Sequence, residues 1–590
     1  MPEALVPARL AFHDGIPYSE AFADLYHSAE GGPEQARHVF LGGNSLPARW
    51  AGRERFVILE AGFGFGLNFF ATWQAWRRDP ARCGRLHYVA VEKHPYSLQD
   101  LRTLHRRYPQ FESEAAELHA NWPCLVPGGH RAELEAGKVV LTLFFSDIKV
   151  ARDLRLAADA FYLDGFAPER NPEMWTPQLM RSLSRLAAPG ATAAAWSDAA
   201  PVRAALEATG FTVEKRPGFG HQKEMLVASN IRSGQPTASK TRNAVVIGAG
   251  IAGAAVCERL CARGWEVELY ERHAAPAQEA SGNLAGAFHP IVTPDDSVFA
   301  RLTRSAFLFS LGQFRRLEGL RWDPCGVLQL ARDEREEESQ RRSVAALALP
   351  PQYAEYVSRD EASMHAGVPV SAHGLWFPRA GWLQPRSLVS ALLEACGNRL
   401  KKNWNASIES LPEAPVVILA NSAEAPRLHA VPHLRLRSVR GQLTHVPAEM
   451  LDAPRVVVLR GGMVLPPVDG VCVVGASYDI DDQDSEPRAD SDAGNLQRLK
   501  NILGMEIAPV TFQNRVAFRS VAPDRLPVAG KIDEGIYGAF AYGSRGLIWA
   551  LLAAELIASQ LEGEPLPLEG KLAAAMDPGR FARRARLRAS

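Results

Sequence analysis

The sequence predicts an α/β protein with two nucleotide-binding modules in tandem. Apolar runs of strand length alternate with helical stretches, which is typical of mostly parallel, doubly wound sheets. Two of these runs lead directly into glycine-rich turns, Glu60–Gly66 with the spacing E-x-G-x-G-x-G and Gly248–Gly253 with the spacing G-x-G-x-x-G. Because the two spacings differ, we expect two cofactors of different kinds in one chain.

The bulk composition indicates a soluble globular protein. Its 590 residues exceed what one hydrophobic core usually organises, so roughly two to four domains are expected. Lys plus Arg equals Asp plus Glu at 66 each, so the net charge does not support a nucleic-acid partner, although a local basic face is not excluded. The cysteines lack zinc or disulfide spacing, and no apolar run approaches the roughly 18 residues of a membrane helix. We expect a cytoplasmic monomer or small homo-oligomer with no metal and no membrane contact.

A polar segment with Gly and Pro, residues 231–243, predicts a linker between a first module at 1–230 and a second at 244–590. The strands expected in the first module are Arg55–Leu59, Leu86–Val91, Val139–Phe145, Ala160–Leu163, Ala191–Trp196, Phe211–Glu214 and Met225–Ala228. Ligands of such sheets bind at the carboxyl ends of the strands.

The second module opens with a strand–turn–helix–strand unit at Ala244–Tyr270. Short β-rich segments follow, and a long helix begins near Leu547. This order predicts a nucleotide-binding α/β domain, at about 244–300, 385–425 and 515–575, interrupted by a β-rich substrate part at about 320–385 and 430–510. The β-rich segments are Gly326–Leu330, Gly374–Phe377, Val456–Leu459 and Val471–Gly475.

Acidic residues stand at the ends of successive strands in the first module. Glu92 can accept both hydroxyls of a ribose, Asp147 can bind an adenine amino group, and Asp164 ends the fourth strand. Each acid alone is more simply explained as a helix cap or turn residue. The ordered set suits a cationic nucleoside such as S-adenosylmethionine and predicts a class I, Rossmann-like methyltransferase sheet. The residues expected to bind this donor are Glu60, Gly62, Gly64, Gly66, Glu92 and Asp147.

Asp164 is the predicted catalytic residue of the first module. An amine attacks a methyl sulfonium only in its neutral form, so a carboxylate near the donor can orient the amine and accept its proton. The loop Pro168–Trp175 follows and is expected to form a wall of the acceptor pocket. Trp175 is either a stacking surface for a base or, more simply, a packed core residue.

The second glycine turn has a partner carboxylate at dinucleotide spacing. Glu271 lies eighteen positions beyond Gly253, at the end of the next strand. NAD and FAD both fit this pattern. Two later segments favour FAD: Ala280–Asn283, where further phosphate contacts are expected, and Gly543–Leu547, a further glycine turn that opens a helix. The residues expected to bind FAD are Gly248, Gly250, Gly253, Glu271, Ser281, Gly282, Asn283, Gly543, Ser544, Arg545, Gly546 and Leu547.

Arg519 is the candidate substrate-binding and catalytic arginine of the second module. A planar guanidinium can clamp a substrate carboxylate through two hydrogen bonds. A structural arginine is an equal alternative, and Arg440, ahead of a β run, is a weaker candidate for the same role.

The combined motifs resemble the family of bifunctional tRNA 5-methylaminomethyl-2-thiouridine biosynthesis proteins over nearly the whole chain. The segments similar to its methyltransferase motifs are Phe40–Asn44, Glu60–Asn68, Leu163–Pro168, Asn171–Trp175, Lys215–Gly220 and Lys223–Leu226. Those similar to its oxidoreductase motifs, of the amino-acid-oxidase type, are Ala280–Asn283, Gly381–Leu383, Arg440–Gln442, Gly475–Tyr478 and Gly543–Leu547.

The resemblance implies a tRNA wobble uridine that carries a carboxymethylaminomethyl group as the substrate. The FAD module is then expected to oxidise the N–CH2 bond so that glyoxylate leaves, and the first module to methylate the resulting primary amine. Arg519 suits this scheme because the first substrate carries a carboxylate. Lys215, Arg216, Lys223 and the arginines between residues 580 and 588 are the expected phosphate contacts.

Two other hypotheses remain open from the sequence. In the first, both chemistries act on a small amino-acid-like metabolite, which the neutral net charge favours. Alternatively, one module is a degenerate binding domain that only delivers tRNA, which the intact glycines and acids at both sites argue against.

Overall fold

The structure, a computed structural model, describes residues 3–230, 241–508 and 510–589. Most of the predicted linker, residues 231–240, lies outside this description. The chain divides into two compact units. The N-terminal unit comprises Leu5–Ser239 and Glu562–Lys571, and the C-terminal unit comprises Met1–Ala4, Lys240–Leu561 and Leu572–Ser590. Both units contain α/β sheets, so the predicted fold class is confirmed.

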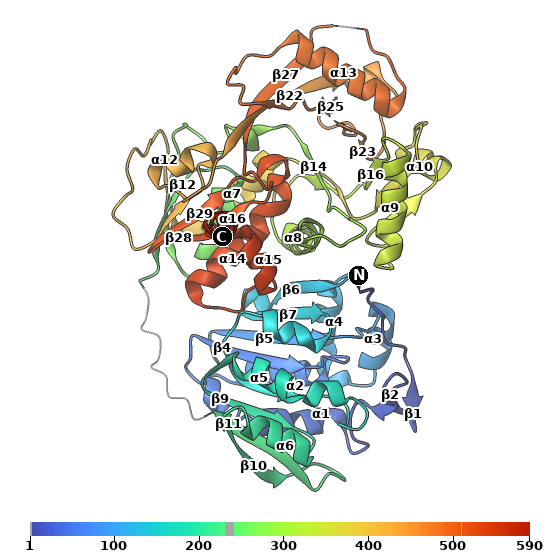
Figure 1. Ribbon diagram of the computed structural model, residues 1–590, viewed down its shortest axis with the longest axis vertical. Helices are drawn as coiled ribbons and strands as arrows, with labels where there is room; N and C mark the ends of the chain where they lie inside the picture. Colours follow the sequence, from blue (N-terminus) through green and yellow to red (C-terminus); the bar gives the residue numbers. More distant parts are fainter. Residues whose placement is uncertain (1–2, 231–240, 509, 590) are drawn as a thin grey trace. The chain divides into compact units, whose positions relative to one another are not determined.

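The N-terminal unit is organised around an eight-stranded sheet with the order β10-β11-β9-β8-β4-β5-β7-β6 (Figure 1). Strands β4, β5, β7, β8 and β9 are parallel, and all seven predicted strand runs lie in this sheet. The sheet strands are β4 Arg55–Ala61, β5 Arg85–Glu92, β6 Gly128–Leu134, β7 Val139–Phe145, β8 Ala158–Leu163, β9 Ala187–Ala195, β10 Phe211–Pro217 and β11 Glu224–Asn230. Because helices cover both faces, the central strands are mostly apolar, and every residue of β7 is buried.

Two hydrophobic clusters, one on each face, hold these helices on the sheet. Phe69, Phe70 and Trp73 of α2 belong to one cluster, and Leu179 and Leu183 of α5 to the other. The helices are α1 Gly32–Gln35, α2 Leu67–Arg78, α3 Leu98–His105, α4 Glu112–Asn121, α5 Pro177–Ser184 and α6 Ala200–Glu207, with a π-helix at Ala36–Gly42. A separate small sheet precedes them, with β1 Phe12–His13, β2 Ile16–Ser19 and β3 Asp24–Leu25.

The C-terminal unit contains a six-stranded nucleotide-type sheet with the order β20-β13-β12-β21-β29-β28. Its strands come from three distant stretches of the chain: β12 Asn243–Ile247 and β13 Glu266–Tyr270, then β20 Leu400–Asn403 and β21 Val417–Leu419, and finally β28 Val528–Asp533 and β29 Ile536–Phe540. Helix α7, Ile251–Cys261, connects β12 to its parallel neighbour β13.

The stretches between these strands supply a nine-stranded, mostly antiparallel sheet and a three-stranded one, and the four predicted β-rich segments all lie in the larger sheet (Figure 1). The larger sheet holds β16 Val327–Leu330, β17 Glu355–Val357, β18 Gly374–Phe377, β22 Arg437–Pro447, β23 Val457–Leu459, β24 Met463–Val464, β25 Val471–Gly475, β26 Asp479–Ile480 and β27 Gln513–Val521. The smaller one holds β14 Gly286–Phe288, β15 Trp322–Asp323 and β19 Gly381–Leu383.

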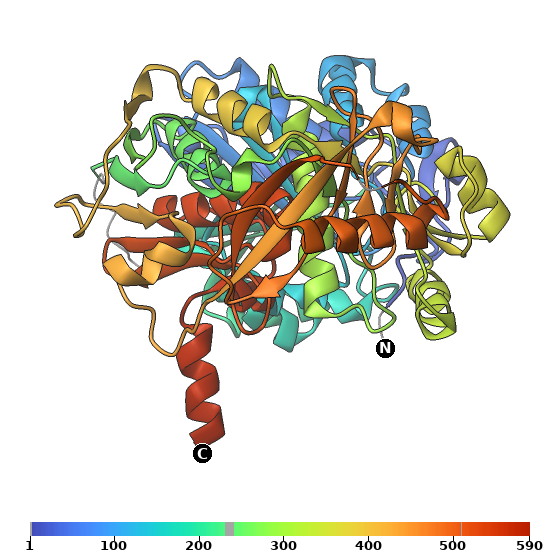
Figure 2. The ribbon, with the colours of Figure 1, turned by 90° about the horizontal axis from the view of Figure 1, so that it is seen from above.

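The remaining helices lie between and after these strands in the sequence. Figure 2 shows the last of them, α16, projecting from its unit. They are α8 Val298–Phe314, α9 Glu334–Ala346, α10 Arg359–Ala366, α11 Pro385–Ala395, α12 Ala425–Leu428, α13 Ala489–Leu503, α14 Gly546–Glu562, α15 Gly570–Met576 and α16 Arg580–Ala589. None of the helices in the described residues is long and apolar enough to cross a membrane.

Candidate functional sites

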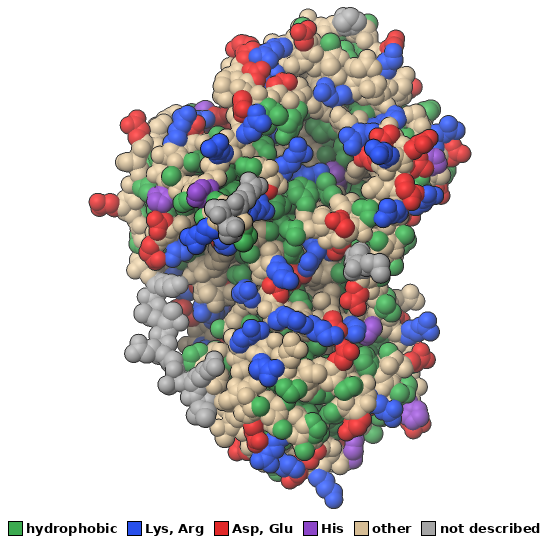
Figure 3. Space-filling model, viewed as in Figure 1, with side chains coloured by type: hydrophobic (Ala, Val, Ile, Leu, Met, Phe, Trp, Pro, Cys, Tyr) green, Lys and Arg blue, Asp and Glu red, His purple; other side chains and the backbone are tan. Residues whose placement is uncertain are grey.

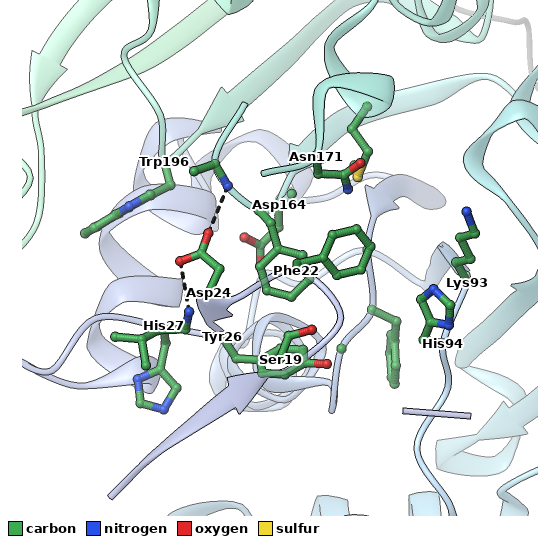
Figure 4. A pocket seen from close by; sticks show the side chains of 18 of the residues that line it. Ser19, Phe22, Asp24, Tyr26, His27, Lys93, His94, Asp164, Asn171 and Trp196 are labelled. Carbon is green, nitrogen blue, oxygen red and sulfur yellow. Dashed lines mark hydrogen bonds between the residues drawn. The ribbon is translucent and has the colours of Figure 1, made fainter. Parts of the chain in front are cut away.

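A cavity of about 860 Å³ lies in the N-terminal unit beside the carboxyl ends of its parallel strands (Figure 4). Its lining includes Gly62, Gly64, Glu92, Asp147 and Asp164, which the sequence placed at one ligand site. The structure therefore brings these predicted residues together around one space.

The turn between β4 and α2 depends on its glycines. Gly62, Gly64 and Gly66 all have positive φ angles, of 100°, 54° and 88°. A Cβ atom on Gly62 would lie 2.4 Å from the carbonyl oxygen of Asp164, so no side chain fits there. The turn after β4 thus passes directly against the end of β8, which carries the predicted catalytic acid.

Glu92 and Asp147 also have structural partners. One carboxylate oxygen of Glu92 accepts the N–H groups of Phe63 and Gly64 at 3.0 and 2.7 Å, which braces the glycine turn. Asp147 accepts the N–H of Lys149 at 2.9 Å and lies 3.3 Å from the ammonium of Lys93. Glu92 therefore stabilises the glycine turn and Asp147 caps a short helix, in addition to any contact that these two acids make with a nucleoside.

Asn68, which the analysis of strand ends missed, connects the other two acids. Its side-chain N–H group donates to Glu60 Oε1 at 2.8 Å and to Asp164 Oδ2 at 2.6 Å from the first turn of α2. The pKa of Asp164 is raised to about 7. Burial is the main cause and the charge of Glu92 adds to it, whereas the hydrogen bond from Asn68 lowers the pKa. Burial and the charge of Asp164 likewise raise the pKa of Glu60, which is fully buried. Asp164 can therefore exchange a proton near neutral pH.

Trp175 is a core residue. Only 6% of it is exposed, it belongs to a hydrophobic cluster, and its ring N–H donates to the carbonyl of Phe166 at 3.2 Å. The alternative of a packed core aromatic is confirmed, and the cavity wall is formed by other rings, among them Phe22, Tyr26, Phe166 and Trp196.

In the C-terminal unit, the second glycine turn has the close contacts of a dinucleotide site. A Cβ atom on Gly253 would lie 1.9 Å from the carbonyl oxygen of Gly248. Glu271 is buried and accepts the N–H of Ala249 at 2.8 Å, while Ser281 Oγ accepts the N–H of Ile251 at 3.0 Å. The backbone of this turn and the first turn of α7 are therefore arranged as in sites that bind a pyrophosphate at a helix N-terminus.

The later predicted segments meet this turn. A Cβ atom on Gly546 would lie 3.7 Å from Ile251, the first residue of α7. The glycine turn before α14 therefore lies beside the Gly248–Gly253 turn. Gly282 has no room for a side chain, because a Cβ atom would lie 2.1 Å from the guanidinium of Arg515. The side-chain oxygen of Asn283 is buried without a hydrogen-bond partner in the described structure. An unsatisfied acceptor at this place fits a bound FAD, which would supply the missing donor.

The two candidate arginines differ completely in their surroundings. Arg440 is fully buried and donates to the carbonyls of Asp484 and Glu486 at 2.7 and 2.6 Å, and to the side chain of Gln442 at 3.1 Å. Arg440 is therefore a structural residue, and the weaker prediction that it binds a substrate carboxylate is wrong.

The side chain of Arg519 lacks such partners: among the described residues its guanidinium makes no hydrogen bond or ion pair, and the residue is partly exposed. Its guanidinium lies against Gly441, where a Cβ atom would approach it to 2.4 Å. Burial lowers the pKa of Arg519, an effect that the nearby Tyr478 and Asp479 oppose. Arg519 is thus the one of the two that is available to an anionic ligand.

Arg545, in the turn before α14, is also enclosed. Burial lowers its pKa to about 10, and its guanidinium lies 5.9 Å from the ring centroid of Phe299. In the part of the chain that the structure describes, no group of three or more His, Cys, Asp or Glu residues is placed to hold a metal ion.

Comparison with known proteins agrees with both sites. Residues 243–560 match the family model of FAD dependent oxidoreductases, and residues 109–231 match that of S-adenosyl-L-methionine-dependent methyltransferases. The chain is 46% identical to the tRNA 5-methylaminomethyl-2-thiouridine biosynthesis bifunctional protein of Azoarcus sp. (strain BH72), over 98% of each chain. It is 45% identical to that of Paraburkholderia phytofirmans and 44% identical to that of Thiobacillus denitrificans, in both cases over 99% of each chain.

Among solved structures, glycine oxidase from Geobacillus kaustophilus is similar over 58% of this chain and 99% of its own, with 18% identity and a TM-score of 0.49.

The two folds, their sites and the family models define a methyltransferase and an FAD-dependent oxidoreductase joined in one chain, with S-adenosylmethionine and FAD as cofactors. The sequence identity of 45–46% with relatives over the full length defines a narrower group than these two classes of enzyme. The chain belongs to the family of tRNA 5-methylaminomethyl-2-thiouridine biosynthesis bifunctional proteins.

The contact at Gly253 predicts the effect of adding one methyl group. Gly253→Ala forces a Cβ atom against the Gly248 carbonyl, so we expect FAD to bind about tenfold to a hundredfold more weakly. Visible flavin absorbance of the purified protein and FAD titration measure this. Gly312→Ala, in α8, is the matched control because nothing lies within 4 Å of the added atom. Equal FAD affinity in both variants would contradict the assignment of this turn.

Proposed function

We propose that this protein modifies the wobble uridine of tRNA in two steps. The C-terminal unit removes the carboxymethyl group from 5-carboxymethylaminomethyl-(2-thio)uridine, and the N-terminal unit methylates the resulting amine. The observation that carries the proposal is the identity of about 45% with relatives of that name, which extends through both sites. We place the reaction in the cytoplasm, where the tRNA substrate is available.

The first step needs a positively charged group for the carboxylate of the substrate. FAD, when bound, would accept a hydride from the CH2 carbon of the carboxymethyl group while the nitrogen loses its proton; water would then hydrolyse the resulting C=N bond to the primary amine and glyoxylate. Arg519 would hold the substrate carboxylate through two hydrogen bonds, which its unpaired guanidinium allows. Glu271 and the Gly248–Gly253 turn would hold the ribose and pyrophosphate of the cofactor.

The second step needs a neutral amine beside the methyl donor. The nitrogen lone pair attacks the methyl carbon of S-adenosylmethionine as the carbon–sulfur bond breaks, and the amine proton passes to Asp164. Its pKa of about 7 allows a sizeable ionised fraction at neutral pH. Asn68 keeps one oxygen of Asp164 fixed, so that the carboxylate is oriented before the amine arrives.

The tRNA phosphates need exposed cations that have no internal partner. Lys215 is paired with Asp198 and Glu224, Arg216 with Glu214, and Arg580 with Asp524. These three are therefore weaker candidates than the sequence suggests. Lys223 and Arg586 are exposed, and we propose them as phosphate contacts; Arg588 has no described side chain.

A small amino-acid-like substrate is the second candidate. Both basic and acidic side chains are exposed on the face seen in Figure 3, and the chain carries equal numbers of them, 66 each. Oxidation and methylation of a free N-substituted glycine without any RNA would favour this candidate.

The direct test uses tRNA from cells that lack this enzyme. The purified protein, FAD, S-adenosylmethionine and this tRNA are incubated, and the tRNA is digested to nucleosides. Conversion of the carboxymethylaminomethyl nucleoside to the methylaminomethyl nucleoside is expected. If the first nucleoside persists while the flavin is bound, the proposal fails.

Replacement of the catalytic acid should separate the two steps. Asp164→Asn keeps the shape but removes the proton acceptor, so methyl transfer should slow by about 10²–10⁴-fold. Glyoxylate release should not change, and the aminomethyl nucleoside should accumulate. Calorimetric titration with S-adenosylmethionine serves as the control for an intact donor site. Methyl transfer at the wild-type rate would exclude Asp164 as the base.

The raised pKa of Asp164 predicts the pH dependence of methylation. Below about pH 7 the carboxyl is protonated and cannot accept the amine proton, so the single-turnover rate should fall as the pH drops through this value. Asn68→Ala removes a donor that lowers this pKa, so the inflection should move to higher pH. An inflection at the same pH in both proteins would contradict the coupling.

Arg519 should matter only for the first step. Arg519→Ala removes the carboxylate partner, and we expect KM for the carboxymethylaminomethyl substrate to rise about tenfold to a hundredfold. Arg519→Lys keeps the charge but loses the two-point geometry and should recover only part of the affinity. Methylation of tRNA that already carries the aminomethyl group is the control and should be unchanged. Normal oxidation by Arg519→Ala would remove the clamp assignment.

A further inference from the structure

Two phenylalanine rings lie face to face in the cavity of the N-terminal unit. Phe22 and Phe166 both line it, with ring centroids 4.7 Å apart and an interplanar angle of 23°. Phe166 is only two residues beyond Asp164, and Phe22, Phe166 and Asp164 all line the same cavity, in which Figure 4 labels Phe22 and Asp164. The cavity that holds the acid proposed to accept the proton therefore also contains a flat aromatic surface.

Phe166 is held firmly in place. Its ring meets the edge of Tyr26 at 5.3 Å, and its carbonyl accepts the ring N–H of Trp175 at 3.2 Å. The next residue, Ala167, donates its N–H to Asp24 at 3.0 Å. These contacts come from both sides of the loop, so Phe166 is a fixed wall of the cavity.

Phe22 is attached much more loosely. It lies in the loop between β2 and β3, where its neighbours Ala21 and Ala23 are exposed. Apart from Phe166, its aromatic contact is an edge-on approach to His94 at 5.9 Å. The Phe22 ring can therefore move away from Phe166 without disturbing the core of the unit.

The rest of the lining restricts what can enter. Asp24, Glu92, Asp147 and Asp164 face this cavity, and such an acidic lining repels phosphates while it accepts neutral or cationic groups. A pyrimidine base with an aminomethyl substituent is planar and neutral in its ring and basic at its amine. Bases stack on aromatic side chains without regard to their hydrogen-bonding pattern.

We propose that Phe166 and Phe22 form a stacking slot for the uracil ring of the acceptor nucleoside, with Phe166 as the wall and Phe22 as the movable cover. In the free protein Phe22 occupies the stacking position on Phe166. A uracil that takes this position would have its 5-substituent in the cavity that Asp164 lines. The inference rests on the proposed function and adds to it the recognition of a flipped-out base rather than of an aliphatic amine.

Variants of Phe22 test the slot through the separation of KM from kcat. With tRNA that carries the aminomethyl group, Phe22→Ala and Phe22→Leu should both raise KM about tenfold to a hundredfold, because leucine is apolar but cannot stack. Phe22→Tyr and Phe22→Trp should restore most of the affinity. Loss by Ala together with full rescue by Leu would show simple packing and overturn the proposal.

Two further measurements separate the slot from other roles. Calorimetric titration with S-adenosylmethionine should give the same Kd for Phe22→Ala and wild type, whereas a weakened Kd would place Phe22 in the donor site and overturn the slot. The free 5-aminomethyl-2-thiouridine nucleoside should quench the additional emission that Phe22→Trp has over the wild type, and methylamine should not. Equal behaviour of the two amines would also overturn it.

The outcome for the wild type distinguishes this inference from the proposed function. If the wild-type protein does not methylate the tRNA, the proposed function fails. If the wild type methylates it and Phe22→Ala does so with an unchanged KM, the function stands and the stacking slot alone is wrong.

Discussion

Both nucleotide sites depend on backbone segments that approach too closely for any side chain. A Cβ atom on Gly62 would overlap the carbonyl of Asp164, and one on Gly253 would overlap the carbonyl of Gly248. The first contact joins the turn after β4 to the end of β8, strands that pair in parallel. The proposed catalytic acid and the turn predicted to bind the donor are therefore fixed relative to each other by the main chain, and side chains only refine their positions.

The acids around the first site oppose folding unless something offsets their charge. Burial raises the pKa of Glu60, Glu92 and Asp164, and the charge of Asp164 raises that of Glu60 further. Asn68 offsets part of this cost by donating to both Glu60 and Asp164. The positive sulfonium of the methyl donor would offset more of it. The same electrostatics that is unfavourable in the free protein would thus favour binding of the donor.

The sequence predicted the parts of the sites that depend on local chain geometry. Glycines in tight turns and acids at strand ends leave a local signal, so Gly62, Glu92 and Asp164 were found. The contacts of Asn68 and Phe22 were missed because they arise only when distant segments pack together, one as a bridge to two acids and the other as a ring stack. The edge strand β6 was missed because Gly128–Leu134 lacks a continuous apolar run.

The arginines of the second unit show how burial separates structural from ligand-binding cations. Arg440 and Arg519 lie on neighbouring paired strands, β22 and β27, so sequence position did not distinguish them. Arg440 is surrounded by carbonyl and amide acceptors that replace its hydration. Arg519 is only partly buried, and its guanidinium has no such acceptors among the described residues. An anion at Arg519 would form charge-assisted hydrogen bonds to a guanidinium that has no competing protein partner there. The substrate of the first step carries such an anion and its product does not, so this interaction would favour binding of the substrate over the product.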